Sequence, residues 1–175
     1  MQKWLSWTIG LSLTSMVVAC SPTNQQISPA ILNSRYTDEQ PALSGDGRFI
    51  AFVSNRGSDR QIVMYDLQRR QLVDLLRLNQ QEVITESPSL SYTGRYLAYL
   101  ASDQGRPEIK LYDRVTKRSQ SLTLGYVNWL RNPSISADGR YIVFETSRRG
   151  QWDIEVLDRG SNIELDIPDG KSSRR

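Results

Sequence analysis

A unit of roughly 45 residues occurs three times in this chain, and this repeat limits the possible folds more than any other feature. The twelve residues that begin at Pro41, Pro88 and Pro133 read PALSGDGRFIAF, PSLSYTGRYLAY and PSISADGRYIVF. The three prolines are 47 and 45 residues apart, and the alignment continues without a gap to Asp66, Asp113 and Asp158. This period is close to that of a propeller blade, so the sequence indicates one structural unit in three copies.

Each unit has the pattern of four short β-strands separated by turn residues such as Asp46-Gly47, which accept the positive φ of a tight turn. In the first unit we expect strands at 41–44, 48–53, 61–65 and 71–75. In the second and third units the last three strands fall at 96–100, 108–112 and 119–124, and at 141–145, 153–157 and 162–167. A single sheet of this size cannot bury both faces, and stacking sheets around an axis solves this problem. We therefore predict an all-β fold, a partial β-propeller of three four-stranded antiparallel blades at about 41–78, 88–124 and 133–167.

The composition argues against an enzyme. The chain has no histidine and one cysteine, Cys20, which excludes a Ser-His-Asp or Cys-His site, a His-ligated zinc and an intramolecular disulfide. No glycine-rich phosphate loop or metal-ligand spacing is present. We predict a non-catalytic protein with no cofactor and no metal.

The net charge of +3 does not predict nucleic-acid binding. The basic excess comes from the chain ends, at Lys3, Lys171, Arg174 and Arg175. A nucleic-acid footprint needs a clustered basic patch on the folded body, so nucleic acid is not an expected partner.

The first residues are typical of a secretory signal. A charge-free stretch from Trp4 to Ala19 follows Lys3; it is short for a membrane span and fits the apolar region of a signal peptide at 1–19. It ends in Val17-Val18-Ala19-Cys20, which resembles the lipobox of bacterial lipoproteins. The resemblance implies that Cys20 is acylated and holds the protein on a membrane surface facing the periplasm, and Ser21 favours the outer membrane. Residues 20–34 have the composition of a tether, and 169–175 form a basic tail.

The repeated block, followed by a third strand that ends in Asp, resembles the WD-like blade of TolB-type propellers. The resemblance covers about residues 35–168, and the second unit departs from the pattern with Thr93 where its neighbours have Asp. It implies a protein-interaction module, with partners such as a peptidoglycan-associated lipoprotein or a Tol-type complex, and a link to a Tol-Pal-type envelope system. Together with the lipobox at Cys20, it implies that this module is lipid-anchored and faces the periplasm. A different hypothesis is a propeller that binds carbohydrate or a cation, or a carboxylate-based enzyme.

Three blades leave two large blade faces uncovered, whereas closed propellers have about four to eight blades. TolB propellers have six. We therefore expect a homodimer that completes six blades, or docking of the chain on another propeller. The alternative is an open stack in which Ala30–Asn33 supplies a closing strand.

Residues that repeat in every unit are expected to be structural. Asp66, Asp113 and Asp158 should cap the turns that follow the third strands, and the repeated arginines should be turn or cross-strand partners. Positions that break the repeat are better candidates for function, and those in the second-to-third and fourth-to-first connections share one face of a propeller. The predicted partner-binding residues on this face are Arg56, Arg60, Arg106, Tyr126, Trp129, Arg148, Arg149 and Trp152, of the types that dominate protein interfaces.

Overall fold

The computed structural model describes residues 32–167, apart from residues 33, 57–58, 80–82 and 104. The expected signal peptide at 1–19, Cys20, nearly all of the tether at 20–34 and the basic tail at 169–175 lie outside the described residues. So does the expected closing strand at Ala30–Asn33, of which Leu32 alone is described. The described part contains no helix that is long and apolar enough to cross a membrane.

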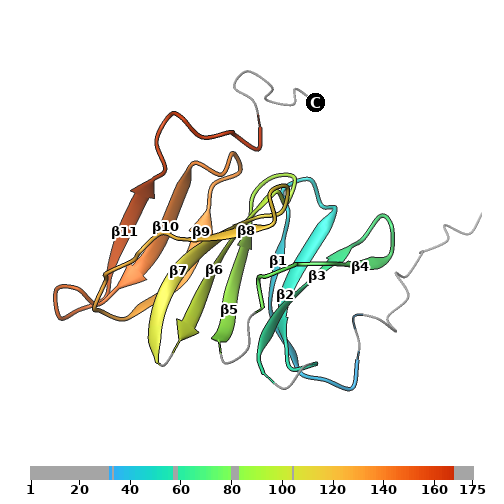
Figure 1. Cartoon of the computed structure of the whole chain (residues 1–175), viewed down its shortest axis with the longest axis horizontal. Helices are drawn as coiled ribbons and strands as arrows, with labels where there is room; N and C mark the ends of the chain where they lie inside the picture. Colours follow the sequence, from blue (N-terminus) through green and yellow to red (C-terminus); the bar gives the residue numbers. More distant parts are fainter. Residues whose placement is uncertain (1–31, 33, 57–58, 80–82, 104, 168–175) are drawn as a thin grey trace, which may run out of the picture.

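Eleven strands form three antiparallel sheets in the described residues (Figure 1). Blade 1 has the order β1-β2-β3-β4, and its strands are β1 (Asp38–Leu43), β2 (Phe49–Ser54), β3 (Gln61–Asp66) and β4 (Gln71–Val73). Blade 2 has the order β5-β6-β7-β8, and its strands are β5 (Val83–Leu90), β6 (Tyr96–Asp103), β7 (Arg106–Asp113) and β8 (Arg118–Ser121). Blade 3 has the order β9-β10-β11, and its strands are β9 (Leu130–Ile135), β10 (Tyr141–Thr146) and β11 (Asp153–Asp158). The all-β partial propeller is confirmed.

The prediction of a fourth strand in blade 3 is wrong, because residues 162–167 form no strand. In blades 1 and 2 the left-handed residue of the outer hairpin lies directly before the fourth strand, at Arg70 (φ 54°) and Lys117 (φ 56°). In blade 3 the left-handed residue is Gly160 (φ 89°), two residues after β11 ends. The chain therefore turns at a different point and leaves the sheet.

The segment that leaves β11 crosses back to blade 2. Glu164 forms an ion pair with Arg95 at 2.7 Å, and the Glu164 carbonyl accepts a hydrogen bond from the Tyr96 hydroxyl at 2.5 Å. The Asp166 carboxylate accepts hydrogen bonds from both the backbone N–H (2.6 Å) and the hydroxyl of Thr93. In blades 1 and 3 the turn has its own carboxylate, since the Arg48 and Arg140 N–H groups donate to Asp46 and Asp138, each at 2.9 Å. Asp166 thus places a carboxylate at the turn of the second unit, where Thr93 stands instead of Asp, although it binds Thr93 and not the Arg95 N–H.

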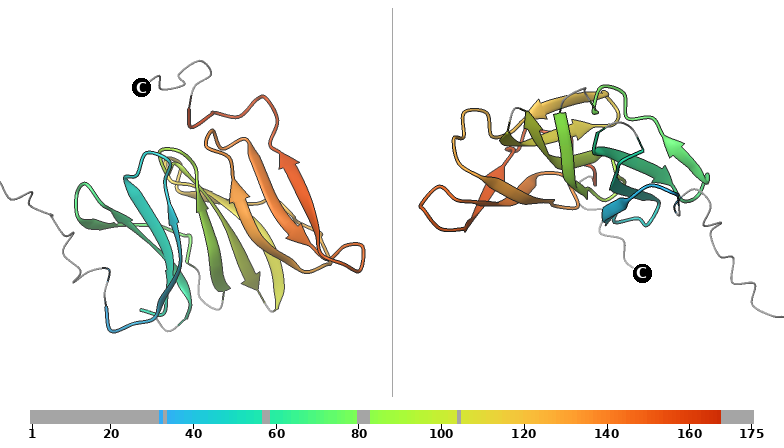
Figure 2. Two further views of the ribbon diagram at one scale, coloured as in Figure 1. Left: turned by 180° about the vertical axis from the view of Figure 1, so that it is seen from behind. Right: turned by 90° about the horizontal axis from the view of Figure 1, so that it is seen from below.

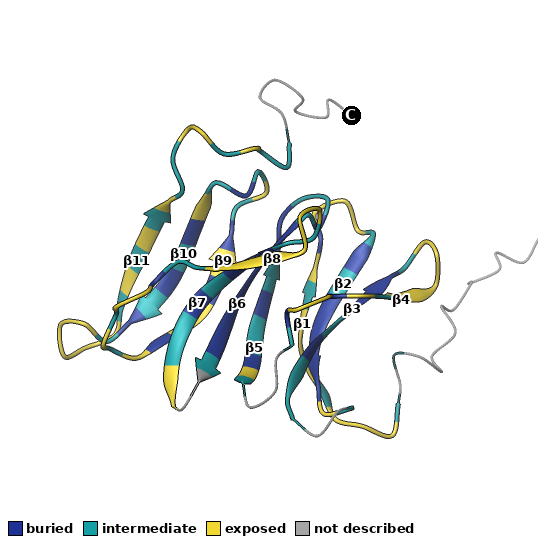
Figure 3. Ribbon diagram, in the orientation of Figure 1, coloured by how far each residue is buried: buried dark blue, intermediate teal, exposed yellow. Residues whose placement is uncertain are grey.

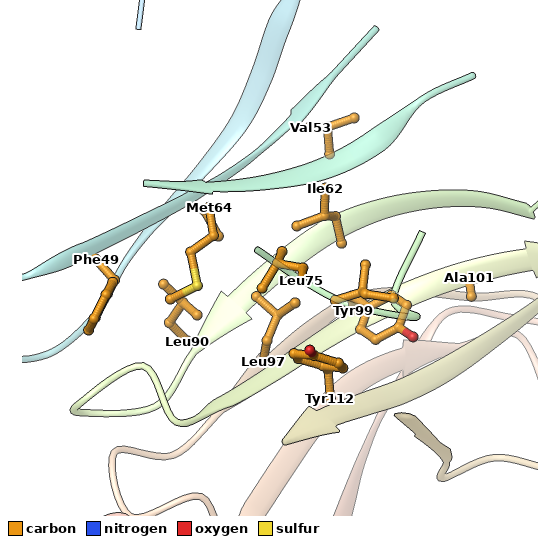
Figure 4. Packing of buried hydrophobic residues seen from close by; sticks show 12 residues of the cluster. Phe49, Val53, Ile62, Met64, Leu75, Leu90, Leu97, Tyr99, Ala101 and Tyr112 are labelled. Carbon is orange, nitrogen blue, oxygen red and sulfur yellow. The ribbon is translucent and has the colours of Figure 1, made fainter. Parts of the chain in front are cut away.

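The three blades stack side by side (Figure 2). Apolar residues pack between them. The first core lies between blades 1 and 2 (Figure 4) and includes Phe49, Ile62, Met64, Leu90 and Tyr112. The second lies between blades 2 and 3 and includes Tyr96, Ile109, Leu111, Ile142 and Phe144. Blade 2 is covered on both faces, and its strand β6 is buried along most of its length (Figure 3).

The same contact joins each pair of neighbouring blades. The turn glycine of the following blade lies on an aromatic ring of the preceding one: a Cβ at Gly94 would be 3.1 Å from Phe49 Cδ2, and a Cβ at Gly139 would be 2.4 Å from Tyr96 Cδ2. An arginine of the following blade stacks on the same ring, with Arg114 4.2 Å from the Phe49 centroid and Arg159 4.4 Å from the Tyr96 centroid. Blade packing is therefore encoded in the repeated residues themselves.

Candidate functional site

The repeated carboxylates are structural, as predicted. Asp66 accepts hydrogen bonds from the backbone N–H groups of Gln68 (3.0 Å) and Arg69 (2.9 Å) and binds Arg48 at 2.7 Å. Asp113 binds Arg95 at 3.3 Å and Asp158 binds Arg140 at 2.8 Å. Each pair joins the start of the second strand to the end of the third strand, so the column closes a hairpin.

These pairs hold the aspartates in the charged form. The hydrogen bond from Arg48 lowers the pKa of Asp66, and that from Arg140, with the Gly160 N–H, lowers the pKa of Asp158 to about 2. Burial acts to raise the pKa of Asp113, but Arg95 and the Val115 N–H lower it overall. A carboxyl with a lowered pKa is a poor general acid at neutral pH, so this array suits structure better than acid–base chemistry.

The eight predicted partner-binding residues lie at one end of the stack, which we call the lower rim. It consists of the β2–β3, β6–β7 and β10–β11 connections and the segments that lead into β1, β5 and β9. Within each blade the strand register brings the connection and the segment before the first strand to the same end, since Asp38 pairs with Ser54, Val83 with Asp103, and Leu130 with Thr146. In Figure 1 this rim is the lower edge of the molecule.

Three of the eight residues, Arg106, Tyr126 and Trp129, line a pocket on the lower rim. Its volume is about 280 Å³, and its lining residues are Gly105, Arg106, Pro107, Tyr126, Val127, Asn128 and Trp129. The Trp129 side chain is 64% exposed and Val127 is 92% exposed. Arg106 is also exposed, and no described side chain forms an ion pair with it. The pocket therefore combines exposed apolar surface with one positive charge.

Tyr126 forms one wall of this pocket and is fixed by contacts with blade 3. Its hydroxyl donates to Glu155 at 3.1 Å, and its ring meets Phe144 edge-on with centroids 6.2 Å apart. Burial raises the pKa of Tyr126, and the hydrogen bond to Glu155 adds to this effect. Arg148 lies 3.8 Å from the same Glu155 carboxylate. Tyr126 and Arg148 are thus tied to blade 3, whereas Trp129 and Arg106 are exposed at the pocket.

The other predicted residues are not brought into this pocket. Arg56 binds Asp38 at 3.0 Å, and Arg60 binds Glu39 at 3.2 Å and Glu86 at 3.8 Å, all at the blade 1 end of the rim.

Two further predicted residues lie around the β10–β11 hairpin. Arg149 binds Asp153 at 3.0 Å. Trp152 stacks under Arg131, with the guanidinium 3.8 Å from the ring. Arg131 in turn binds Glu145 at 2.6 Å, so these charges are satisfied within blade 3.

Sequence reasoning missed Val127 and the crossing segment with Glu164 and Asp166. A signal existed for both. Val127 lies in a connection that no other unit matches, and Thr93 is the one position where a turn lacks its carboxylate. Within the described residues no group of three or more Cys, Asp or Glu side chains is arranged to hold a metal ion.

Comparisons with known proteins place the chain among the propellers. No protein-family model and no curated protein matches it. It is similar to the crystal structure of TolB from Acinetobacter baumannii, with 26% identity and a TM-score of 0.62 over 73% of this chain and 31% of that one. It also resembles a putative TolB from Agrobacterium tumefaciens, with 21% identity and a TM-score of 0.55 over 76% of this chain and 49% of that one.

A third similar structure is the β-propeller domain of the Trilobed protease from Pyrococcus furiosus, with 18% identity and a TM-score of 0.53 over 70% of this chain and 39% of that one. That likeness concerns the fold alone. The chain spans 31% of the length of the first TolB chain and 49% of the second. The TolB-like propeller fold expected from the repeats is therefore confirmed.

Proposed function

We propose that this chain is a non-catalytic protein-interaction module that presents the lower-rim pocket to a partner protein. The observation that carries this proposal is the exposure of Trp129 beside Arg106 in a pocket of about 280 Å³. Tryptophan and arginine are the residues that contribute most often to binding energy at protein interfaces. The supporting wall around Tyr126 holds the pocket open before a partner arrives, which lowers the entropic cost of binding.

The likeness to TolB supports a partner in the bacterial envelope. Because the chain covers only part of each TolB chain, the partner is proposed by chemistry: a segment with an apolar side chain for the Trp129 pocket and an acidic group for Arg106. A peptidoglycan-associated lipoprotein or a Tol-type complex is the first candidate, within a Tol-Pal-type system. The homodimer with six blades is a separate proposal, because it concerns the two ends of the blade stack and not the lower rim.

The pocket is tested by photo-crosslinking in cells. A photoreactive amino acid at Val127, which is 92% exposed in the pocket, should crosslink to one envelope protein. Trp129→Ala combined with Arg106→Ala should reduce that product at least tenfold. Val115 is the matched control, because it is apolar and 67% exposed but lies in the β7–β8 turn at the opposite end. Equal crosslinking from Val115 and Val127 would contradict a binding role for the rim.

We further propose that acylated Cys20 anchors the module to the membrane, facing the periplasm, with the outer membrane as its site. Two or more acyl chains give stable anchoring because each buried CH₂ contributes about 0.8 kcal/mol. Metabolic labelling with a fatty-acid analogue should mark the wild-type chain and leave Cys20→Ser unmarked. Equal labelling of both chains, or no label on either, would contradict the proposal that Cys20 carries a lipid anchor.

A further inference from the structure

The outer face of blade 3 has the composition of a blade-docking face. At four aligned positions of the repeat, the side chain points from its own blade toward the next one. Their members in blades 1 and 2 are nearly inaccessible, at 0–3% exposure: Phe49, Ala51, Ile62, Met64, Tyr96, Ala98, Ile109 and Leu111. Their counterparts in blade 3 include Tyr141 (40%), Ile154 (66%) and Val156 (64%).

This exposed face is continuous across blade 3. Tyr141 in β10 and both Ile154 and Val156 in β11 lie on one side of the sheet, because Val143 pairs with Val156 and Glu145 pairs with Ile154. Figure 3 shows the exposed residues alternating along β11. Large apolar side chains at regular positions on one sheet face mark an interaction surface.

Blade 1 carries the matching half of the contact. In blades 2 and 3 the residues that point back to the preceding blade are Leu90 and Ile135, both 8% exposed, whereas their counterpart Leu43 is 58% exposed. Gly94 and Gly139 touch the aromatic ring of the preceding blade, but a Cβ at Gly47 would meet nothing within 4 Å. Gly47 has the same left-handed conformation, with φ 71° against 68° and 82°. The Gly47 turn therefore has the conformation that contacts an aromatic ring in blades 2 and 3, but within the described residues no ring lies against it.

We propose that blade 1 of a second copy of this chain docks on the outer face of blade 3. The two internal blade contacts are the template. Gly47 of the second copy would lie on the Tyr141 ring, as Gly94 lies on Phe49 and Gly139 on Tyr96. Leu43 would pack on Val156, as Leu90 packs beside Met64 in the core of Figure 4. Leu67 occupies the repeat position of Arg114 and Arg159, which stack on the rings of Phe49 and Tyr96. At the proposed contact between copies, an apolar side chain therefore replaces the stacked arginine.

A second copy fits because the same contact forms twice around one two-fold axis. Each chain offers one blade 1 face and one blade 3 face, and two chains of three blades close into a ring of six. Such closure leaves no blade face uncovered. The inference concerns the ends of the stack and does not depend on what the lower rim binds.

Sedimentation of the full chain in detergent, with Cys20→Ser, tests the inference. The protein should be a concentration-dependent dimer. Val156→Lys puts a charge in the contact and should raise the dissociation constant at least tenfold, while far-UV circular dichroism reports an intact fold. Val115→Lys, an equally exposed valine outside both end faces, should leave the dimer unchanged. A monomer at all concentrations, or a dimer indifferent to Val156→Lys, would overturn the proposal.

Disulfide trapping gives a second, independent measurement if Val156→Lys fails to fold. Leu43→Cys and Val156→Cys are made in separate Cys20→Ser chains, mixed and oxidised. We expect a crosslinked heterodimer that contains one chain of each kind, and no such product from Leu43→Cys mixed with Val115→Cys. Equal trapping in both mixtures would show that the copies meet elsewhere.

Discussion

The three turn glycines form a natural series for measuring how much blade packing contributes to stability. Gly47, Gly94 and Gly139 occupy the same turn with φ values of 71°, 68° and 82°. Alanine at each position therefore carries the same backbone cost, about 1–2 kcal/mol for a left-handed non-glycine residue. The positions differ in what the new methyl group meets.

The packing cost should rise along the series. At Gly47 the methyl group meets nothing within 4 Å, so backbone strain alone remains. At Gly94 it would be 3.1 Å from Phe49 Cδ2 and 3.2 Å from Met64 Cε, and the flexible methionine can yield. At Gly139 it would be 2.4 Å from Tyr96 Cδ2, and that ring is held by its hydroxyl hydrogen bond and by Arg159. Overpacking costs about 1–3 kcal/mol, so the full change at Gly139 should be about 2–5 kcal/mol.

Urea unfolding followed by circular dichroism measures these differences as shifts in midpoint at constant slope. The Val156→Lys background keeps the measurement on single chains, where nothing covers Gly47. We expect Gly47→Ala to be the least destabilising, Gly94→Ala intermediate and Gly139→Ala the most. Equal losses at Gly47 and Gly139 would refute the packing of neighbouring blades through these turns.

Two further predictions follow from the carboxylates. Thr93→Asp places a second carboxylate against Asp166 and should lower the unfolding midpoint, whereas Thr93→Asp with Asp166→Asn should recover most of the loss; a double mutant as unstable as the single one would show that the two residues do not interact. Stability should be flat between pH 5 and 8, because the chain has no histidine. The aspartates with lowered pKa values contribute stability that is complete above the unfolded value of about 3.9. That stability should fall progressively as the pH drops through this value toward about 2, the folded value of Asp158. Thermal melts across this range test it, and a midpoint that holds at pH 2 would contradict the role of the Arg–Asp pairs.

The repeat made most of the fold predictable. Aligned columns identified the strands and turns, because every column has one task in all three blades. The serine that precedes each turn shows this: Ser44, Ser91 and Ser136 each accept a backbone N–H at 2.9 Å from the aromatic residue five positions later. The expected capping role of the repeated aspartates followed from the same logic.

The absence of a strand at residues 162–167 of blade 3 could not be predicted from the same pattern. Residues 162–167 alternate apolar and polar side chains, at Ile163, Leu165 and Ile167, as a strand requires. The position of Gly160 in the turn decides the outcome, together with the bonds that Glu164 and Asp166 make to blade 2. Those contacts join residues about 70 positions apart in the sequence, and local pattern carries no information on them.

The sequence predicted the strand connections that carry the candidate site, but not which of their residues line a common pocket. Sequence placed Arg60 and Arg106 in equivalent loops but gave no reason to separate them. In the structure Arg60 is paired with Glu39, whereas Arg106 stands beside Trp129 in the pocket. The difference depends on which side chains of neighbouring segments meet at the rim, and the sequence pattern does not specify these contacts.

Native-state hydrogen exchange tests most directly whether stacked sheets hold this protein together. Strand β6 lies between two covered faces, whereas β11 is the outer strand of a blade with one face exposed. In the single-chain Val156→Lys background, the β6 amides should exchange only through global unfolding, and those of β11 should exchange much faster. Equal protection of the two strands, or rapid exchange of β6, would contradict the stacking of the three blades.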